Sequence, residues 1–469
     1  MAFAGSLLGP SSRAALAQSH YWSENFGNES ILLNGAVIGS VTDPGAVFYN
    51  PARLIHQKDL ALLSGAKVYE WTRTRVDNPL RPGDNLENSG FRGVPSFVVG
   101  SFSIPGLDGH QFAYGVLTRH RSRVRFSYRE EGGLLLPDIE DLDLFVGFTD
   151  FETEFRDDWF GLSWAHPVSE GFSVGASLFY FDRAFARTAR VDLRGIDVVG
   201  DAATVQVERS YQVKDKGLVG KAGVAWQRGR ASAGLSVTLP YWAFADKGFV
   251  RFDDFTLGLP DSTGTRVSRL QSLEQGGLPV EWKTPWSVGL GFGWASGDWQ
   301  FHSAAEYFAA VPVHVVLETD PGSGGMSAGL PIEYTVLDQR KAVFNVGAGV
   351  RWDGSDHLSL FGSVATNGSA APDSLVEFTA LDTLVYQTTL ETDYVLVGGG
   401  VSVSTPWADF TLGATWQGGR DDVARAVQAP SPTPGEEDDD PVVRLDQWRF
   451  LAGFSIPMVD DLLGGVVGR

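Results

Sequence analysis

The sequence predicts an all-β fold, a 14-stranded antiparallel transmembrane β-barrel with an N-terminal plug (hatch) segment. Three observations support this prediction. Segments in which apolar residues alternate with small or polar ones recur along most of the 469 residues, and a period of two is that of a β-strand. The connections between the segments alternate between short and long. No apolar run reaches the length of about 18 residues that a membrane-spanning helix needs.

Composition narrows the possible classes of protein. The chain has 56 Gly, no Cys, 12% aromatic residues and a formal net charge of −20. The absence of Cys excludes a disulfide scaffold and a Cys-based zinc site, and 43% hydrophobic residues exclude intrinsic disorder. The acidic charge argues against a nucleic-acid partner. This composition is typical of a bacterial outer-membrane protein, and also of a secreted all-β protein.

The chain begins with two segments that do not alternate. Residues 1–17 are apolar, and Ala15-Leu16-Ala17 fits a signal-peptide cleavage site. Arg13, the only basic residue before that site, is misplaced for a signal peptide, so a signal peptide and a flexible leader both remain open. Residues 18–57 mix apolar and small residues. We expect them to form a hatch inside the barrel, the alternative being a plain periplasmic extension.

The barrel is predicted over residues 58–456, with residues 457–469 as a periplasmic C-terminal tail. The clearest strand runs from Trp286 to Trp294, with large apolar residues on one face and Ser or Gly on the other. The fourteen alternating segments have these approximate limits: 59–71, 93–104, 110–129, 156–167, 171–193, 215–228, 230–250, 283–295, 298–318, 335–352, 356–366, 389–404, 407–420 and 443–456.

The connections between these segments alternate regularly. Short turns such as Ser169-Glu170 and Ser296-Gly297 alternate with long loops, among them 130–155 and 251–282. Short turns at one end and long loops at the other are typical of a multi-pass barrel in the outer membrane of a Gram-negative bacterium. An even number of strands places both termini on the periplasmic side, and fourteen strands leave a lumen that something must fill or use.

A motif stands at the end of the hatch segment. Its residues are Phe48, Tyr49, Asn50, Pro51 and Ala52. Pro51 fixes its own φ and biases Asn50 away from the helical region, so the motif predicts a rigid elbow between hatch and wall. It resembles the Phe-Tyr-Asn-Pro-Ala-Gly-Leu stretch of FadL-type outer-membrane transporters, which carry long-chain fatty acids and other hydrophobic compounds. Arg53 replaces the Gly of that stretch, and Asn-Pro also occurs in ordinary loops.

The resemblance implies a non-enzymatic channel for passive uptake of hydrophobic or amphipathic small molecules such as long-chain fatty acids. It implies no cofactor and no metal. The expected partners are a hydrophobic small-molecule ligand, outer-membrane lipid and lipopolysaccharide, and the barrel is expected to be monomeric. Two other classes remain open, a non-transport scaffold for secretion or surface attachment and a general diffusion porin.

Two strand faces are candidates for ligand binding. Each face carries residues spaced by two: Arg119, Arg121, Arg123 and Arg125 on the third strand, and Phe179, Phe181, Arg183, Phe185 and Arg187 on the fifth. A lipid-facing Arg costs about 2–4 kcal/mol at the membrane midplane, so these faces should look into the lumen or lie above the membrane. Guanidinium groups suit a carboxylate or a phosphate, and Phe suits an apolar tail. The pattern predicts a pocket for an amphipathic anion, unless the Arg residues pair with acidic residues between positions 130 and 143.

Overall fold

The computed structural model describes residues 20–56, 61–77, 85–102, 104–131, 142–197, 200–260, 265–320, 334–371, 376–380, 383–386, 392–422 and 442–457. The leader predicted over residues 1–17 and residues 458–469 of the predicted tail lie outside this part of the chain. Its helical elements are short: α2 (Glu29–Leu32), α3 (Ala46–Tyr49) and the 3-10 helix η2 (Pro51–His56). No helix in the described part is long and apolar enough to cross a membrane.

Almost all other regular structure is antiparallel β-sheet. The strands are β1 (Ala61–Asp77), β2 (Asn85–Phe102), β3 (Gln111–Glu131), β4 (Leu142–Ser169), β5 (Phe172–Asp197), β6 (Ala202–Arg228), β7 (Ala231–Thr238), β8 (Trp242–Pro260), β9 (Arg266–Leu278), β10 (Ser287–Ser296), β11 (Trp299–Phe308), β12 (Val311–Glu318), β13 (Thr335–Arg340), β14 (Val343–Ser355), β15 (Leu358–Asn367), β16 (Val376–Ala380), β17 (Thr383–Tyr386), β18 (Tyr394–Ser404), β19 (Asp409–Asp422) and β20 (Val442–Pro457).

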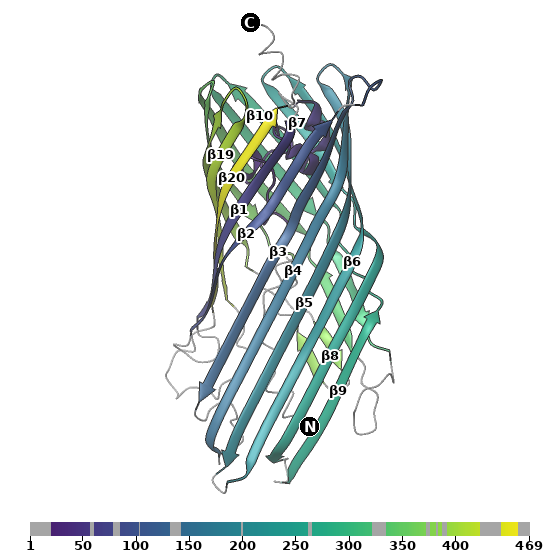
Figure 1. Cartoon of the computed structure of the whole chain (residues 1–469), viewed down its shortest axis with the longest axis vertical. Helices are drawn as coiled ribbons and strands as arrows, with labels where there is room; N and C mark the ends of the chain where they lie inside the picture. The colour runs from purple at the N-terminus through teal and green to yellow at the C-terminus, as the bar shows by residue number, and fades with distance from the viewer. Residues whose placement is uncertain are drawn as a thin grey trace.

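Most of these strands form one sheet of 16 strands, in the order β5-β4-β3-β2-β1-β20-β19-β18-β15-β14-β11-β10-β7-β6-β8-β9. β5 pairs with β6 as well, so the succession of hydrogen-bonded neighbours that leaves β1 through β2 returns to it through β20. The sheet curls into a tall cylinder whose strands are tilted from the long axis (Figure 1). β12, β13, β16 and β17 form a separate four-stranded sheet.

The strands extend further than the sequence predicts. Much of the predicted long loops 130–155 and 251–282 is strand, since β4 begins at Leu142 and β8 and β9 run from Trp242 to Leu278 with a short break. Figure 1 shows β3 to β6, β8 and β9 reaching well beyond the other strands at one end of the cylinder. The predicted limits were wrong there because apolar alternation ends with the apolar exterior, whereas backbone pairing continues beyond it.

The exterior of the cylinder carries a belt of exposed apolar side chains. On β10 the outward residues Leu290, Phe292 and Trp294 are 61%, 48% and 46% exposed, while the intervening glycines face inward. Equally exposed residues on other strands include Tyr114, Phe160, Leu162, Leu178, Phe344 and Leu412. Soluble monomers rarely expose contiguous apolar patches larger than a few hundred Å². An exterior of this kind suits a hydrocarbon environment.

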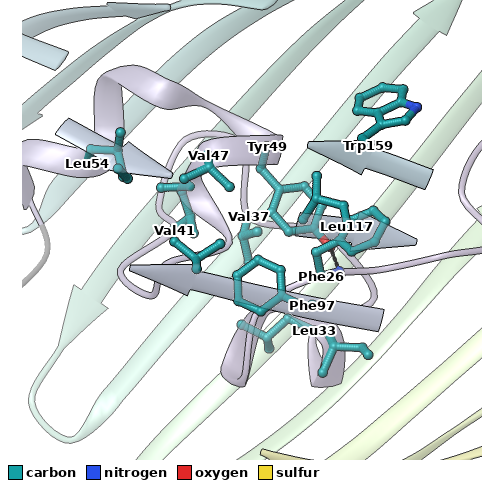
Figure 2. Close-up of a cluster of buried hydrophobic side chains, with 14 of the residues drawn as sticks. Phe26, Leu33, Val37, Val41, Val47, Tyr49, Leu54, Phe97, Leu117 and Trp159 are labelled. Atoms are coloured by element: carbon teal, nitrogen blue, oxygen red, sulfur yellow. Dashed lines mark hydrogen bonds between the residues drawn. The ribbon is translucent and has the colours of Figure 1, made fainter. Parts of the chain in front are cut away.

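Residues 20–56 lie inside one end of the cylinder, where Figure 1 shows them in dark purple, and nearly all of them are buried. Their apolar side chains, among them Phe26 and Val47, pack against inward-facing residues of the wall. Figure 2 shows this cluster, in which Phe97 of β2, Leu117 of β3 and Trp159 of β4 surround the segment. The main apolar core of the protein therefore lies between this segment and the wall.

A single carboxylate organises the segment. One oxygen of Asp43 accepts hydrogen bonds from the backbone N–H groups of Asn28, Glu29 and Ser30 at 2.9, 2.8 and 2.9 Å. The other accepts from the Ser30 hydroxyl at 2.8 Å and from the Gly45 N–H at 3.0 Å. These donors lie at the start of α2 and just before α3, where helix N–H groups have no partner within the helix. Asp43 therefore ties the two short helices together.

The backbone of the segment lies in close contact with the backbone of the wall. A Cβ added to Gly39 would lie 2.2 Å from the carbonyl oxygen of Gly291 on β10, so the two backbones touch. Two ion pairs add to this contact. Glu24 pairs with Arg449 at 2.8 Å and is buried, and Glu29 pairs with Arg351 at 2.5 Å and is partly exposed. Breaking a buried pair by removing one partner costs about 3–5 kcal/mol. Backbone contact and ion pairs together fix the segment in position.

Candidate ligand-binding site

The motif residues of the hatch segment run from the end of α3 to the start of η2. Asn50, between α3 and η2, has extended backbone at φ −156°. Its amide group donates to the carbonyl oxygens of Ile38 and Val224, both at 3.0 Å, and accepts from the Ala52 N–H at 3.1 Å. The Asn50 side chain thus bridges two parts of the segment to β6. A Cβ added to Gly223 would lie 2.0 Å from its Oδ1 atom, so this position of the wall must be glycine.

Phe48, the first residue of the motif, lines a cavity of about 90 Å³ between the segment and the wall. Other rings that line it are Tyr21, Trp22, Tyr49, Trp159, Tyr241 and Phe308. Phe48 and Trp159 lie 5.9 Å apart and Trp159 and Tyr241 lie 5.7 Å apart, measured between ring centroids. We call this space the aromatic cavity. It offers flat apolar surfaces on several sides.

Charged groups also line the aromatic cavity. The Lys221 ammonium lies 4.4 Å from the centroid of the Phe48 ring, and the Arg119 guanidinium carbon lies 5.4 Å from it. Glu306 accepts hydrogen bonds from the Trp22 indole at 2.8 Å and from a serine hydroxyl of β10 at 2.7 Å. The cavity can therefore hold an aromatic or apolar group while presenting two cations to one edge of it.

The five predicted residues of β5 all face inward and are buried. Phe179 and Phe181 belong to the core around the hatch segment, and Phe185 belongs to a second core further along the strand. Arg187 lies 5.0 Å from the centroid of the Phe151 ring. These Phe side chains are packed within the two cores of the wall. They do not line the aromatic cavity.

Arg183 is held by the protein itself. Its guanidinium makes a two-point ion pair with Asp215, at 2.8 and 2.5 Å. The rings of Phe181, Tyr241 and Trp282 surround it at 5.4, 4.9 and 4.3 Å. With its acceptor and its aromatic contacts already in place, this guanidinium has little capacity left for a ligand anion.

The four predicted arginines of β3 do not share one face. A register shift between Thr118 and His120 reverses the alternation, because a bulge inserts one extra residue. Arg119 therefore reaches the interior and donates to the Tyr21 carbonyl oxygen at 2.7 Å. The other three are exposed on the outer side: Arg121, Arg123 and Arg125. The expectation of a single inward ladder of four guanidiniums is wrong for this reason.

Two of the outer arginines pair with carboxylates of the neighbouring strand. Arg123 pairs with Glu152 at 2.5 Å and Arg125 pairs with Asp150 at 3.1 Å. The alternative partners expected from the sequence lie between positions 130 and 143, and residues 132–141 of that stretch lie outside the described residues. The observed partners lie further along the chain, on β4, because antiparallel pairing brings that strand beside β3.

β2 and β3 separate along the wall. Their pairing runs only from Phe97 opposite Leu117 to Phe102 opposite Phe112, although β2 goes on pairing with β1 and β3 with β4. Near the point of separation β3 carries its register shift, and β2 carries Pro95, which has no N–H for a ladder bond. The hydrogen-bonded ladder of the wall therefore has a gap between residues 85–96 and residues 118–131, and the Asn88 amide donates to the Arg125 carbonyl oxygen across it.

A cavity of about 310 Å³ lies at this gap. Gly90 and Arg92 border it on one side, and His120 and Ser122 on the other. Three of the predicted arginines also line it: Arg121, Arg123 and Arg125. Its inner end is lined by His20, Ser23 and Glu24 of the hatch segment. Glu24 also lines the aromatic cavity, and a third cavity of about 70 Å³ shares linings with both. The three cavities thus adjoin one another from the gap to the hatch.

The most important cavity residue missed by the sequence reading is Lys221. It lies on the inward face of β6, where it is 6% exposed. The signal was present, because a lysine on one face of a strand whose other face is apolar must point away from lipid. Trp159 and Tyr241 were also missed, since their partners come from distant parts of the chain.

The described ranges hold no group of three or more His, Asp or Glu side chains that could hold a metal ion. Gly171-Phe172-Ser173-Val174-Gly175 has the spacing of a nucleophile elbow. However, Ser173 is buried on β5 and its hydroxyl donates to the Ala52 carbonyl oxygen at 2.8 Å. This serine therefore anchors the hatch segment to the wall.

Comparison with known proteins gives a result for the fold alone. No family model matches the chain, and no curated protein matches it. Among solved structures, a FadL homologue of Pseudomonas aeruginosa is 11% identical with a TM-score of 0.55, covering 89% of this chain and 94% of its own. The monoaromatic hydrocarbon channel CymD is 12% identical with a TM-score of 0.52, covering 92% and 98%. The toluene transporter TodX of Pseudomonas putida is 11% identical with a TM-score of 0.51, covering 93% and 98%. The chain therefore has the fold of the FadL homologue, CymD and TodX over nearly its whole length.

Proposed function

We propose that the protein is an outer-membrane channel for the passive uptake of small hydrophobic or amphipathic compounds. In this proposal the 14 strands of the sheet other than β8 and β9 form a closed transmembrane barrel, and residues 18–57 form a hatch that blocks the lumen. The observation that carries the proposal is the aromatic cavity, which lies inside a sheet whose exterior is apolar. An apolar exterior suits lipid, and a ring-lined interior suits an apolar solute.

The gap between β2 and β3 suggests a route. A solute would enter from the long-strand end, bind in the aromatic cavity beside Phe48, and leave through the cavity at the gap into the outer leaflet. The adjoining cavities support this path, since Glu24 lines both the gap cavity and the aromatic cavity. The hatch would then not have to leave the lumen during each passage.

Cavity size bears on the substrate. About 90 Å³ is of the same order as the roughly 150 Å³ cavity that takes one benzene molecule. A long alkyl chain would need much more room, so a single ring fits better than a long-chain fatty acid. CymD is a monoaromatic hydrocarbon channel and TodX is a toluene transporter, which supports a single-ring compound as the probe.

A non-transport scaffold is the second candidate. One observation favours it, namely that β4, β5 and β6 continue well beyond most other strands at one end of the cylinder (Figure 1), which would present a wall outside the cell. A general diffusion porin has less support, because residues 20–56 occupy the lumen and are buried there.

Uptake of radiolabelled toluene at limiting concentration, in a Gram-negative host that lacks its own hydrocarbon channels, tests the proposal. The wild-type protein should raise the initial rate. Gly90→Trp should lower it several-fold, because a Cβ at Gly90 meets no atom within 4 Å and the larger ring would fill the gap cavity. Leu290→Trp, on the lipid-facing side of β10, is the matched control and should leave the rate unchanged. A wild-type rate equal to that of the empty host would refute the channel and leave the scaffold.

A further inference from the structure

The outer face of the wall changes from apolar to charged at one level on three neighbouring strands. The last apolar residues of β4, β5 and β6 lie opposite one another: Phe160, Tyr180 and Leu218. The next outward residues toward the long-strand end also lie in register, and they are charged: Asp158, Asp182 and Lys216. In a membrane barrel, such a change marks the level at which hydrocarbon gives way to polar headgroups.

Exposed rings gather at this edge of the apolar belt, where β6 meets β8. Trp242, opposite Leu218 on the outer face, is 70% exposed, and Phe244 is 58% exposed. The centroids of the Phe244 and Tyr180 rings lie 6.4 Å apart. Aromatic side chains are enriched at the boundary between hydrocarbon and headgroups, so these rings indicate the same level as the change in polarity.

The next row of outward residues holds three cations. Arg156 of β4, Lys214 of β6 and Lys247 of β8 lie at one level, on strands that stand side by side in Figure 1. Lys214 and Lys247 are exposed and directly opposite each other. Like charges in that position destabilise a sheet. Neither lysine forms an ion pair within the described ranges, so an anion from outside the chain would offset the repulsion.

The carboxylates of this region are already engaged. Asp158 and Asp182 lie 3.3 and 3.6 Å from Arg156, and Asp182 also lies 3.8 Å from Lys216. Asp246 precedes Lys247 but lies opposite Asp215, which is buried on the inner face. We call the four cations of this outer surface the basic patch: Arg156, Lys214, Lys216 and Lys247. They face two carboxylates, although the whole chain carries a net charge of −20.

We propose that the basic patch binds the phosphate groups of a phosphorylated glycolipid, the lipopolysaccharide of the outer leaflet. Its acyl chains would lie along the apolar belt, with Trp242 and Phe244 against the sugar and the first methylenes. Lys214 lies four residues beyond Leu218, which is about 13 Å along the strand, and a lysine stem can carry its ammonium group part of that way back toward the membrane. Lysine binds phosphate as a point charge. The inference goes beyond uptake and rests on the outer-membrane placement in the proposed function.

The experiment compares lipid A carrying both phosphates with the same lipid A after both are removed. Binding to the purified full-length protein is measured by microscale thermophoresis in non-ionic detergent at low salt, with EDTA present to remove bridging cations. The wild type should prefer the phosphorylated form by about 30-fold, from two lysines near a lipid surface. Lys214→Gln combined with Lys247→Gln should abolish the preference and leave binding of the dephosphorylated form unchanged.

Arg251→Gln is the matched control. Arg251 is an exposed cation further along the outer face of β8, and it is already paired with Asp253 at 2.7 Å and Glu208 at 3.6 Å. This variant should keep the full preference. Both lysines are exposed, so the double variant should fold, and heat-modifiable migration on gels checks that it does.

Equal affinity for the two forms of lipid A in the wild type would overturn the inference, and so would a preference that persists in the double variant. Phosphatidylglycerol bound as tightly as phosphorylated lipid A would overturn the assignment to a glycolipid. The toluene uptake assay distinguishes failure of this inference from failure of the channel. Toluene uptake without the lipid A preference would remove the glycolipid site and keep the channel, whereas the preference without toluene uptake would keep the site and remove the channel.

Discussion

Replacing Asp43 tests how the hatch is held. Asp43→Ala leaves four buried backbone N–H groups without an acceptor, those of Asn28, Glu29, Ser30 and Gly45. Each buried donor left unsatisfied costs about 1–3 kcal/mol, so the loss is about 4 kcal/mol at its lower limit. A loss of this size is comparable to the whole stability of a small folded unit. We expect the hatch to lose its fixed structure while the pairing of the barrel strands persists.

Single-channel conductance in planar bilayers measures this effect. The wild type should show low conductance, whereas Asp43→Ala should show frequent large openings as the lumen clears. Asp43→Asn keeps one acceptor oxygen but turns a donor toward the N–H groups, so it should be intermediate. Asp298→Asn, in an exposed turn, is the control and should match the wild type. Heat-modifiable migration on gels checks that the barrel remains folded. Conductance of Asp43→Ala equal to that of the wild type would show that the hatch is not held by this carboxylate, or does not block the lumen.

Three further predictions concern the wall and the segment. Gly291→Val should displace the hatch and raise conductance, because a Cβ there would lie 2.3 Å from the Gly39 nitrogen. Unchanged conductance would contradict the close backbone contact between Gly39 and Gly291. Asp215→Asn leaves Arg183 buried without its anion and should lower the free energy of unfolding by about 3–5 kcal/mol, measured by urea denaturation, whereas a loss below about 1 kcal/mol would contradict the buried pair. Burial lowers the pKa of His20 to about 4 while the unfolded chain titrates near 6.5. Its stabilising contribution is therefore complete above about pH 6.5 and is lost as the pH falls toward 4. His20→Gln should reduce the acid sensitivity of hatch fluorescence over that range, and an unchanged pH profile would count against a buried neutral imidazole.

The facing of strand residues was predicted best where the environment differs most between the two faces of a strand. Leu290, Phe292 and Trp294 alternate with glycine because one face meets the apolar exterior and the other meets the hatch. The prediction failed at Arg121 because one inserted residue near Thr118 reverses the faces of a strand, and no periodicity shows a bulge beforehand.

The cavity was the least predictable part. Lys221, Arg119 and Phe48 are far apart in the chain and meet only after the sheet has curled around residues 20–56. Alternation indicates which side of the wall a residue faces, but it does not indicate its neighbours across the lumen. Phe179 and Phe181 lie in the core around residues 20–56, and their packing partners depend on that three-dimensional arrangement.

The pairing of β1 with β20 has a consequence for the order of assembly. Sixteen residue pairs, from Ala61 with Pro457 to Asp77 with Val442, join the two ends of the sheet, and the Asn28 amide donates to the Phe454 carbonyl oxygen 426 positions away. Contacts of such long range form late, since the entropy of closing the loop must be overcome first. Residues 20–56 precede β1 directly, so they can settle on the inner face of the open sheet while its terminal strands are still unpaired. The last step of folding would then be the pairing of β1 with β20 around residues 20–56 that are already in place. Until that step is complete, β1 and β20 would be exposed edges that a chaperone or a second chain could bind.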